Sequence, residues 1–173
     1  HRKVYGHIHS PGNEPSAITV GAANTFGTDV RSDDVIDTFS SRGPTRSFWK
    51  DPTGVKHYDN LIKPDLVAPG NKIIGAAAQD NALVTLHPEL CVGKTNGNTG
   101  HMRLSGTSVA APIVAGAAAV LLAENPNLTP NMVKMVLMYT AQPLAKFNML
   151  EQGAGEMNIE GAVRLAKLVR TDL

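Results

Sequence analysis

The chain has 173 residues, of which 42% are hydrophobic and 18% charged, and its formal net charge is +1. This length and apolar content are those of one globular domain with a real core, which excludes an intrinsically disordered chain. The 16 basic and 15 acidic residues are mixed along the sequence, so there is no basic stripe of the kind that nucleic-acid binding needs. A single cysteine, Cys91, excludes an internal disulfide. No stretch resembles a signal peptide, and we expect no membrane partner.

The first part of the chain predicts a bent loop followed by a buried strand. The proline-rich segment 11–16 marks the loop, and the apolar run over residues 17–22 is typical of a short buried strand. His7 and His9 have the i, i+2 spacing that places both on one face of an extended chain, where they could hold a metal ion. No third ligand lies nearby in the sequence, so we expect two solvated histidines.

The middle of the chain alternates short strand candidates with loops. Apolar runs favour strands near residues 36–39, 66–68 and 72–75. Residues 45–60 predict a surface loop, and we expect its aromatic side chains to cover part of the core. Residues 79–103 are polar and become rich in glycine and asparagine, which predicts a long excursion before the next element.

The most informative stretch is segment 104–122, LSGTSVAAPIVAGAAAVLL. A helix that is apolar on every side is a buried one, and this one is short for a membrane span. Thr107 and Ser108 lie where a small-residue turn becomes the helix, a position where hydroxyl groups commonly cap backbone N–H groups. The alternative is that Ser108 is a nucleophile. Gly106 would permit a tight turn, and the helix N-terminus would present N–H groups and positive dipole to a developing oxyanion.

Two further helices are predicted after this segment. Thr129 is a suitable N-cap and Pro130 a suitable first residue for a helix over residues 130–141, with one buried face. A last helix is expected over residues 158–169, after a glycine-rich step. We expect an α/β fold, in which the strands near residues 17–22, 66–68 and 72–75 supply part of a parallel sheet and the helices near residues 107–123, 130–141 and 158–169 cover it.

Several motifs together resemble one known family. GTSVAAP (106–112), followed by a helix of small residues, resembles the nucleophile segment of the subtilisin-like serine proteases, the subtilase family. FSSRGP (39–44), KPDLVAPG (63–70) and the closing G-x-G step recur there in the same order, so the match spans nearly the whole chain. The resemblance implies an α/β fold with a three-layer arrangement of a parallel sheet and flanking helices. It also implies that residues 1–173 are the C-terminal half of a peptidase domain, truncated on its N-terminal side.

The same resemblance implies the chemistry. Ser108 would attack a peptide carbonyl of a polypeptide substrate and form an acyl-enzyme, and the backbone of Gly106, Thr107 and Ser108 would bind substrate and oxyanion. No cofactor is required. The carbonyls of Gly12, Glu14 and Ala17 are weak candidates for a structural Ca²⁺ or Na⁺, although a plain loop is favoured because hard cations usually need carboxylates as well. A secreted or extracytoplasmic location is also implied.

The departures from the family pattern concern the rest of the triad. The D-x-G segment with the triad aspartate, the H-G-T-H segment with the triad histidine and the oxyanion asparagine are all absent, and Asn13 is only a look-alike. Asp65 is expected to serve loop hydrogen bonding, since the family's triad acid lies far upstream. We therefore expect the chain to be inactive alone and to need the missing N-terminal half as a partner. A half sheet exposes an edge, so self-association is also expected.

Three alternatives stay open at this point. His101, shortly before Ser108, could serve as its base, although the family's base lies on a separate upstream helix. A non-catalytic module that binds peptides or a protein partner would keep the fold without the reaction. An esterase-type hydrolase is disfavoured, because the chain lacks G-x-S-x-G and has no histidine after Ser108.

Overall fold

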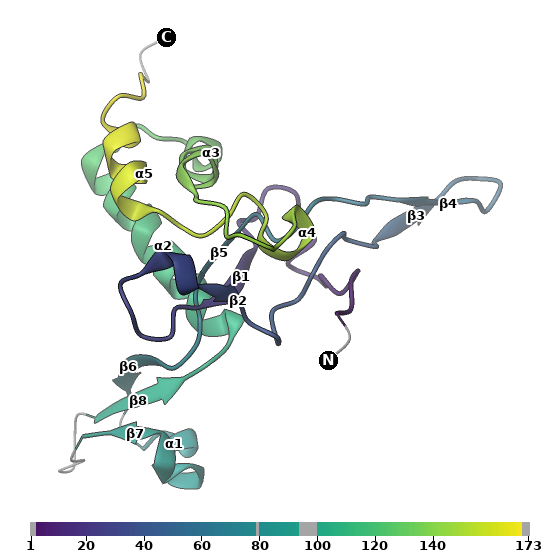
Figure 1. The fold of residues 1–173 in the computed structure, drawn as a ribbon. Helices are drawn as coiled ribbons and strands as arrows, with labels where there is room; N and C mark the ends of the chain where they lie inside the picture. The colour runs from purple at the N-terminus through teal and green to yellow at the C-terminus, as the bar shows by residue number, and fades with distance from the viewer. Residues whose placement is uncertain (1–2, 79, 94–99, 171–173) are drawn as a thin grey trace.

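A computed structural model describes residues 3–78, 80–93 and 100–170. Its centre is a three-stranded sheet in the order β2-β1-β5, in which β1 (Val20–Asn24) runs parallel to β5 (Leu66–Pro69) and antiparallel to β2 (Val35–Ile36). Figure 1 shows this sheet between helices on one side and a helix with loops on the other. The α/β fold predicted from the sequence is confirmed.

The two faces of the sheet bury different cores because successive strand residues point to opposite sides. Ala22, Leu66 and Ala68 belong to the larger core, which they share with the helices α2 (Thr107–Glu124), α3 (Pro130–Thr140) and α5 (Ile159–Ala166). Ala23 and Val67 face the other way and pack with Ile36 and Leu144, near the short helix α4 (Met149–Gln152). The result is three layers, with the sheet in the middle.

Helices α3, α4 and α5 begin at side-chain caps, of which the sequence analysis predicted the one at Thr129. The Thr129 hydroxyl accepts from the Met132 N–H at the start of α3. Asn148 and Glu151 form a reciprocal capping box at α4, and Asn158 accepts from the Gly161 N–H at the start of α5. Each cap satisfies a helix N–H that would otherwise lack a partner, which stabilises the helix by about 1 kcal/mol.

A second, antiparallel sheet lies beyond the end of α2 that contains Ser108 (Figure 1). Its order is β6-β8-β7, with β6 (Ile73–Ala77), β8 (Gly100–Leu104) and β7 (Cys91–Val92). The short helices α1 (Ala82–Leu86) and η2 (Pro88–Leu90) connect β6 to β7. The prediction that residues 72–75 add to the parallel sheet is therefore wrong, because this strand pairs with the segment that leads into α2.

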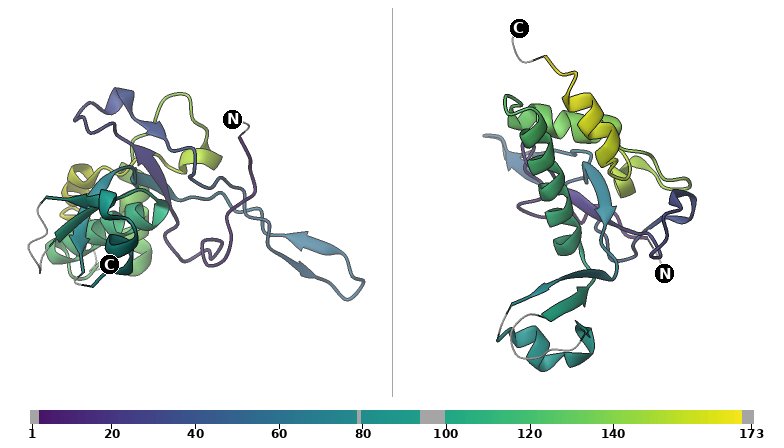
Figure 2. Two further views of the ribbon diagram at one scale, coloured as in Figure 1. Left: turned by 90° about the horizontal axis from the view of Figure 1, so that it is seen from below. Right: turned by 90° about the vertical axis from the view of Figure 1, so that its left-hand side faces the viewer.

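A β-hairpin, β3 (Phe48–Lys50) with β4 (Lys56–Tyr58), projects from the body as an arm (Figures 1 and 2). Trp49 stacks on His57 and Phe48 contacts Tyr58, across the two strands. Trp49 is 62% exposed, and the side chains of Phe48 and Tyr58 are about half exposed. The prediction that the aromatic residues of segment 45–60 cover the core is therefore wrong: they pack on one another.

Candidate active site

The candidate nucleophile lies on a turn that is clamped to the central sheet. β8 leads into this turn, and the Gly106 N–H donates to the Gly70 carbonyl (2.8 Å) just beyond the end of β5. The Gly70 N–H donates in turn to the Ala23 carbonyl of β1 (2.9 Å). A Cβ at position 70 would lie 2.6 Å from the Ala22 Cβ and 3.0 Å from the Gly106 oxygen. Only glycine therefore allows the turn to lie this close to the sheet.

Ser108 is the second residue of α2, and its side chain is exposed. The helix N-cap is Gly106, and no side chain caps this end, so the capping alternative for Thr107 and Ser108 is not what the structure contains. The Val109 and Ala110 N–H groups donate back to the Gly106 carbonyl. The amides of Thr107 and Ser108 have no acceptor among the residues that the structure describes. They leave two free donors, at the positive end of the helix dipole, beside the hydroxyl.

The position of this turn in the fold is also informative. Gly70 and Gly106 lie past the carboxyl ends of the parallel strands β1 and β5. Open α/β sheets place their ligand-binding crevices at this end, where loops from several strands meet. An exposed hydroxyl beside free backbone donors at such a position can support nucleophilic attack on a carbonyl.

Within the described part of the chain, no histidine is hydrogen-bonded to Ser108. His101 lies inside β8, opposite Ala76 and Val92, and the three extended steps from His101 to Leu104 cover about 10 Å before the turn begins. His57 contacts Asp51 (2.9 Å), and this hydrogen bond is the main reason that the pKa of Asp51 falls to about 2, but the pair lies on the projecting arm. His7 and His9 are exposed and contact each other edge to face. Among the described residues there is no group of three metal-ligating side chains.

Asp65 lies at the other end of the sheet, at the start of β5, and is structural. Its carboxylate accepts from the Thr19 N–H (2.7 Å) and pairs with the ammonium groups of Lys63 (2.7 Å) and Lys134 (3.1 Å). Burial lowers the pKa of Lys63, while its contact with Asp65 opposes that shift. The Asp65 carboxylate therefore holds the loop before β1 to the start of β5.

The three candidate cation-binding carbonyls lie near this cluster. The Ala17 carbonyl accepts from both Lys63 and Lys134 (2.9 Å each), and the Gly12 carbonyl accepts from the Thr19 hydroxyl (2.6 Å). The Glu14 side chain bonds to Ser16. Two lysine ammonium groups thus already supply positive charge to this loop, and the binding of Ca²⁺ or Na⁺ stays a prediction.

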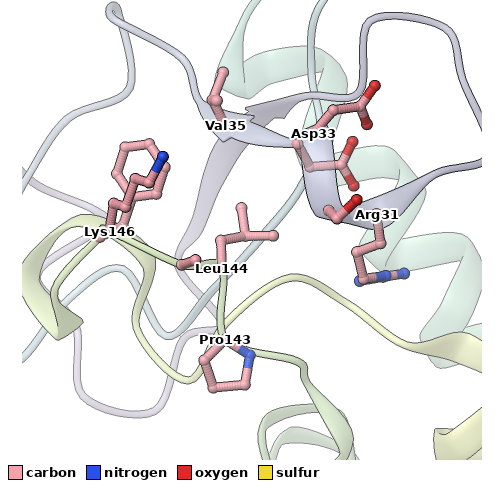
Figure 3. A pocket seen from close by; sticks show the side chains of 10 residues that line it. Arg31, Asp33, Val35, Pro143, Leu144 and Lys146 are labelled. Carbon is pink, nitrogen blue, oxygen red and sulfur yellow. The ribbon is translucent and has the colours of Figure 1, made fainter.

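One cavity of the described residues lies away from the nucleophile. It has a volume of about 500 Å³ and lies between the 3₁₀ turn η1 (Arg31–Asp33) and residues 143–147, as Figure 3 shows. Leu144, which lines it, belongs to the core on the face of the sheet opposite α2. Nearby, burial and a hydrogen bond with Asp34 raise the pKa of Glu156 to about 7, despite its contact with Arg31 (3.3 Å). This cavity is not part of the candidate active site.

Two features of the site were missed by sequence reasoning. One is Gly70, whose only sequence signal is its place in KPDLVAPG. The other is the outward side of α2, which is apolar but not buried. By length and composition α2 is the one described helix that could cross a membrane, yet Ala110, Val114, Ala117 and Leu121 bury one side of it in the core. The lack of charge along 104–122 predicts a fully buried helix, whereas the structure buries only this one side.

The chain matches the model of the subtilase family, the S8 peptidases, over residues 5–160, and it therefore belongs to that family of serine proteases. It is 36% identical over 156 residues to serine protease AprX of Bacillus subtilis, covering 90% of this chain and 31% of the relative. It is 32% identical over 170 residues to subtilisin-like protease SBT6.1 of Arabidopsis thaliana, covering 95% of this chain and 13% of the relative. The chain thus spans about a third or less of these relatives.

Solved structures give the same assignment. The patellamide maturation protease PatA superposes with a TM-score of 0.56 at 28% identity, covering 92% of this chain and 46% of PatA. The Clostridium perfringens CspB protease superposes with a TM-score of 0.66 over 98% of this chain and 31% of its own length. At 24% identity, this second likeness shows the fold alone.

Proposed function

We propose that this chain is the nucleophile-bearing part of a subtilisin-like serine endopeptidase, with Ser108 as the nucleophile. The observation that carries the proposal is the exposed Ser108 side chain at the N-terminus of α2, beside the free amides of Thr107 and Ser108. The family assignment agrees with this role, because it is a family of serine proteases.

The proposed reaction is acyl transfer from a peptide to Ser108 and then to water. The Ser108 Oγ forms a bond to the peptide carbonyl carbon while a histidine takes its proton, and an aspartate orients that histidine. The backbone N–H of Ser108 donates to the oxyanion of the tetrahedral intermediate, where the positive end of α2 also stabilises negative charge. The C–N bond then breaks, the histidine returns the proton to the leaving amine, and water hydrolyses the acyl-enzyme.

In this proposal the histidine, the aspartate and the oxyanion asparagine lie in residues of the same polypeptide outside this chain. Two observations support the placement: no described histidine is bonded to Ser108, and AprX and SBT6.1 are about three or more times longer than the matched region. Without a base the serine hydroxyl is a poor nucleophile near neutral pH, so we expect the isolated chain to be inactive. No cofactor is needed for this chemistry. The extracytoplasmic location and polypeptide substrate remain part of the proposal.

Labelling with a fluorophosphonate probe tests the proposal. We expect the complete gene product to be labelled at Ser108, located by mass spectrometry, and the isolated chain to remain unlabelled. Ser108→Ala should abolish labelling and lower kcat by about 10⁶-fold, the size established for subtilisin. Ser32→Ala is the matched control, because Ser32 is exposed on η1 next to the cavity on the opposite face, and it should change neither.

Two outcomes would contradict the proposal. A folded complete gene product that is not labelled at Ser108 would favour the non-catalytic module that binds peptides or a partner. Labelling of the isolated chain at Ser108 would mean that a histidine of this chain, such as His101, activates it.

A further inference from the structure

The loop after β5, residues 70–72, supports the nucleophile turn at two nearby points. The Gly70 carbonyl accepts from the Gly106 N–H (2.8 Å), and the Lys72 N–H donates to the Ser105 hydroxyl (2.9 Å). Lys72 has a φ of 54°, in the left-handed region that residues with a side chain adopt only where their surroundings hold them. The position of the turn therefore depends on what holds this loop.

Asp37 holds the loop from the end of β2. Its N–H donates to the Ala22 carbonyl of β1 (3.0 Å), and its carbonyl accepts from the Ser40 N–H (3.1 Å), so its backbone is fixed to the central sheet. Its Oδ1 accepts from the Asn71 Nδ2 (2.8 Å). In the described part of the chain, this is the one hydrogen bond that the Asn71 side chain makes.

A carboxylate at this position lowers the stability of the fold. Asp37 is only 6% exposed, and its Oδ2 has no hydrogen-bond partner among the residues that the structure describes. Burial raises the pKa of Asp37, and the hydrogen bond from Asn71 opposes that rise. A polar oxygen taken out of water without a partner costs free energy, so stability alone does not account for an aspartate here. Groups that break such a rule are typical of functional sites.

We infer that Asp37, acting through Asn71, is a positioning residue for the nucleophile turn. The inference rests on the proposed function, in which Ser108 attacks a peptide carbonyl. The hydrogen bond from Asp37 fixes Asn71, which lies between the two residues that contact the turn. The turn then determines where the Ser108 hydroxyl and the free amides of Thr107 and Ser108 lie.

The expected effect is on the rate of the reaction rather than on substrate binding. Without Asp37 the loop and the turn can shift, and a shift of about 1 Å between reacting groups lowers a rate by about 10²-fold. An interaction that matters only in the transition state lowers kcat and kcat/KM equally, so KM should change little. A side chain that only stabilised the fold would leave the kcat of the folded enzyme unchanged.

Asp37→Ala in the complete gene product is the first test, because it removes the acceptor of the Asn71 amide. We expect kcat for a chromogenic peptide to fall about 10–100-fold, with KM within about 3-fold. The rate of fluorophosphonate labelling at Ser108 should fall by a similar factor. Asp59→Ala is the matched control. It removes the hydrogen bond from the Thr45 hydroxyl (2.6 Å) at the base of the arm, and it should change kcat and KM by less than about 2-fold.

Exchanging the two side chains separates positioning from a loss of stability. Asp37→Asn keeps a side-chain oxygen for the Asn71 amide and should retain kcat within about 3-fold. Asn71→Asp places two carboxylates against each other and should lower kcat about 10–100-fold. The double variant, Asp37→Asn with Asn71→Asp, restores an amide-to-carboxylate hydrogen bond in the opposite direction and should recover most of that loss. These variants also test the inference if Asp37→Ala does not fold.

Hydrogen exchange tests the support of the turn without reference to catalysis. In Asp37→Ala we expect the amides of Lys72 and Gly106 to exchange at least ~10-fold faster than in the unsubstituted protein, because the loop opens more often. The Ala154 amide donates to the Asp65 carbonyl (2.9 Å) at the other end of the sheet, and its exchange should be unchanged. Mass spectrometry of peptic fragments measures these rates.

Two results would overturn the inference and leave the endopeptidase proposal intact, provided that Ser108 is labelled. One is an unchanged kcat in folded Asp37→Ala. The other is a double variant that recovers no activity, because the effect would then not pass through Asn71. Faster exchange at Gly106 in Asp37→Ala, in a protein whose Ser108 is never labelled, would do the reverse: Asp37 would hold the turn, and the endopeptidase proposal would be wrong.

Discussion

Helices α2 and α5 pack against each other in the same core, yet their outer sides differ in chemistry. α5 buries Ala162 and Ala166 and exposes Glu160 and Arg164, which form an ion pair one turn apart (2.6 Å). α2 also buries small and branched residues on one side. Its exposed apolar residues, here called the open face, are Ala111, Pro112, Ala115, Gly116, Ala119, Val120, Leu122 and Ala123. The outer side of α5 thus has the charged side chains of a helix that faces water, whereas most of the outer side of α2 lacks them.

The side of the molecule opposite α2 buries charged side chains. Two of its buried carboxylates contact cations of the chain: Glu151 contacts Lys3 (2.8 Å) and Arg42 (3.1 Å), and Glu156 contacts Arg31 (3.3 Å). Such pairing offsets the cost of taking charge out of water. The buried oxygens Asp34 Oδ1 and Asp37 Oδ2 have no hydrogen-bond partner among the described residues. The two sides therefore differ in chemistry: one buries charged groups, and the other carries an exposed apolar helix side.

The largest expected effect comes from a charge placed on the open face. Ala119→Arg should leave the free energy of unfolding of the isolated chain within about 0.5 kcal/mol, because the side chain is in water. In the complete gene product it should lower that free energy by about 3–5 kcal/mol, because the guanidinium would be buried without a partner. Urea unfolding followed by circular dichroism measures both values.

A substitution on α5 is the control for this comparison. Glu160→Ala removes an exposed ion pair and should cost less than about 1 kcal/mol in either protein. Similar costs for Ala119→Arg in both proteins would remove the distinction between an internal and a solvent-facing helix.

Two neighbouring leucines of α2 lie on different sides of the helix. Leu121 is fully buried and Leu122 is 41% exposed. In the isolated chain, Leu121→Ala should lower the free energy of unfolding by about 2–5 kcal/mol, because it leaves a cavity in the larger core. Leu122→Ala should lower it by less than about 1 kcal/mol in the same denaturation experiment. A reversed order would mean that α2 is rotated about its axis.

The smallest expected effect is the pH dependence of stability that comes from Glu156, on the side of the molecule opposite α2. Its pKa is raised from an ordinary 4.5 to about 7, so the folded state holds this proton where the unfolded state loses it. The contribution to stability is complete below pH 4.5 and is lost as the pH rises to about 7. Over that window the free energy of unfolding should fall by roughly 1–3 kcal/mol more in the native chain than in Glu156→Gln. Parallel pH profiles of the two proteins would contradict the assignment.

Local sequence signals predicted much of the fold and the position of the nucleophile. The cap at Thr129 and the apolar periodicity of segments 130–141 and 158–169 act within a few residues, so they locate α3 and α5 without any tertiary information. GTSVAAP placed Ser108 at the start of a helix, and the structure has it there. The strand near residue 74 was assigned to the wrong sheet, because a short apolar run does not reveal its pairing partner.

The aromatic residues of the arm were misplaced for a related reason. Side chains such as Trp49 can pack on a core or on a cross-strand neighbour, and composition is the same in both cases. Whether these aromatic side chains are exposed therefore depends on the tertiary structure and cannot be predicted from composition.

By itself the sequence determined the subtilase family, the α/β class and the identity of the candidate nucleophile, because these depend on residue types in a fixed order. Three features follow from the packing alone: Gly70 supports the nucleophile turn, His101 lies within β8, and one side of α2 is exposed. A helix that is apolar all round has no amphipathic pattern, so its sequence does not show which side will be buried. That choice is made by the strands and helices that pack against it, and here they cover one side of α2.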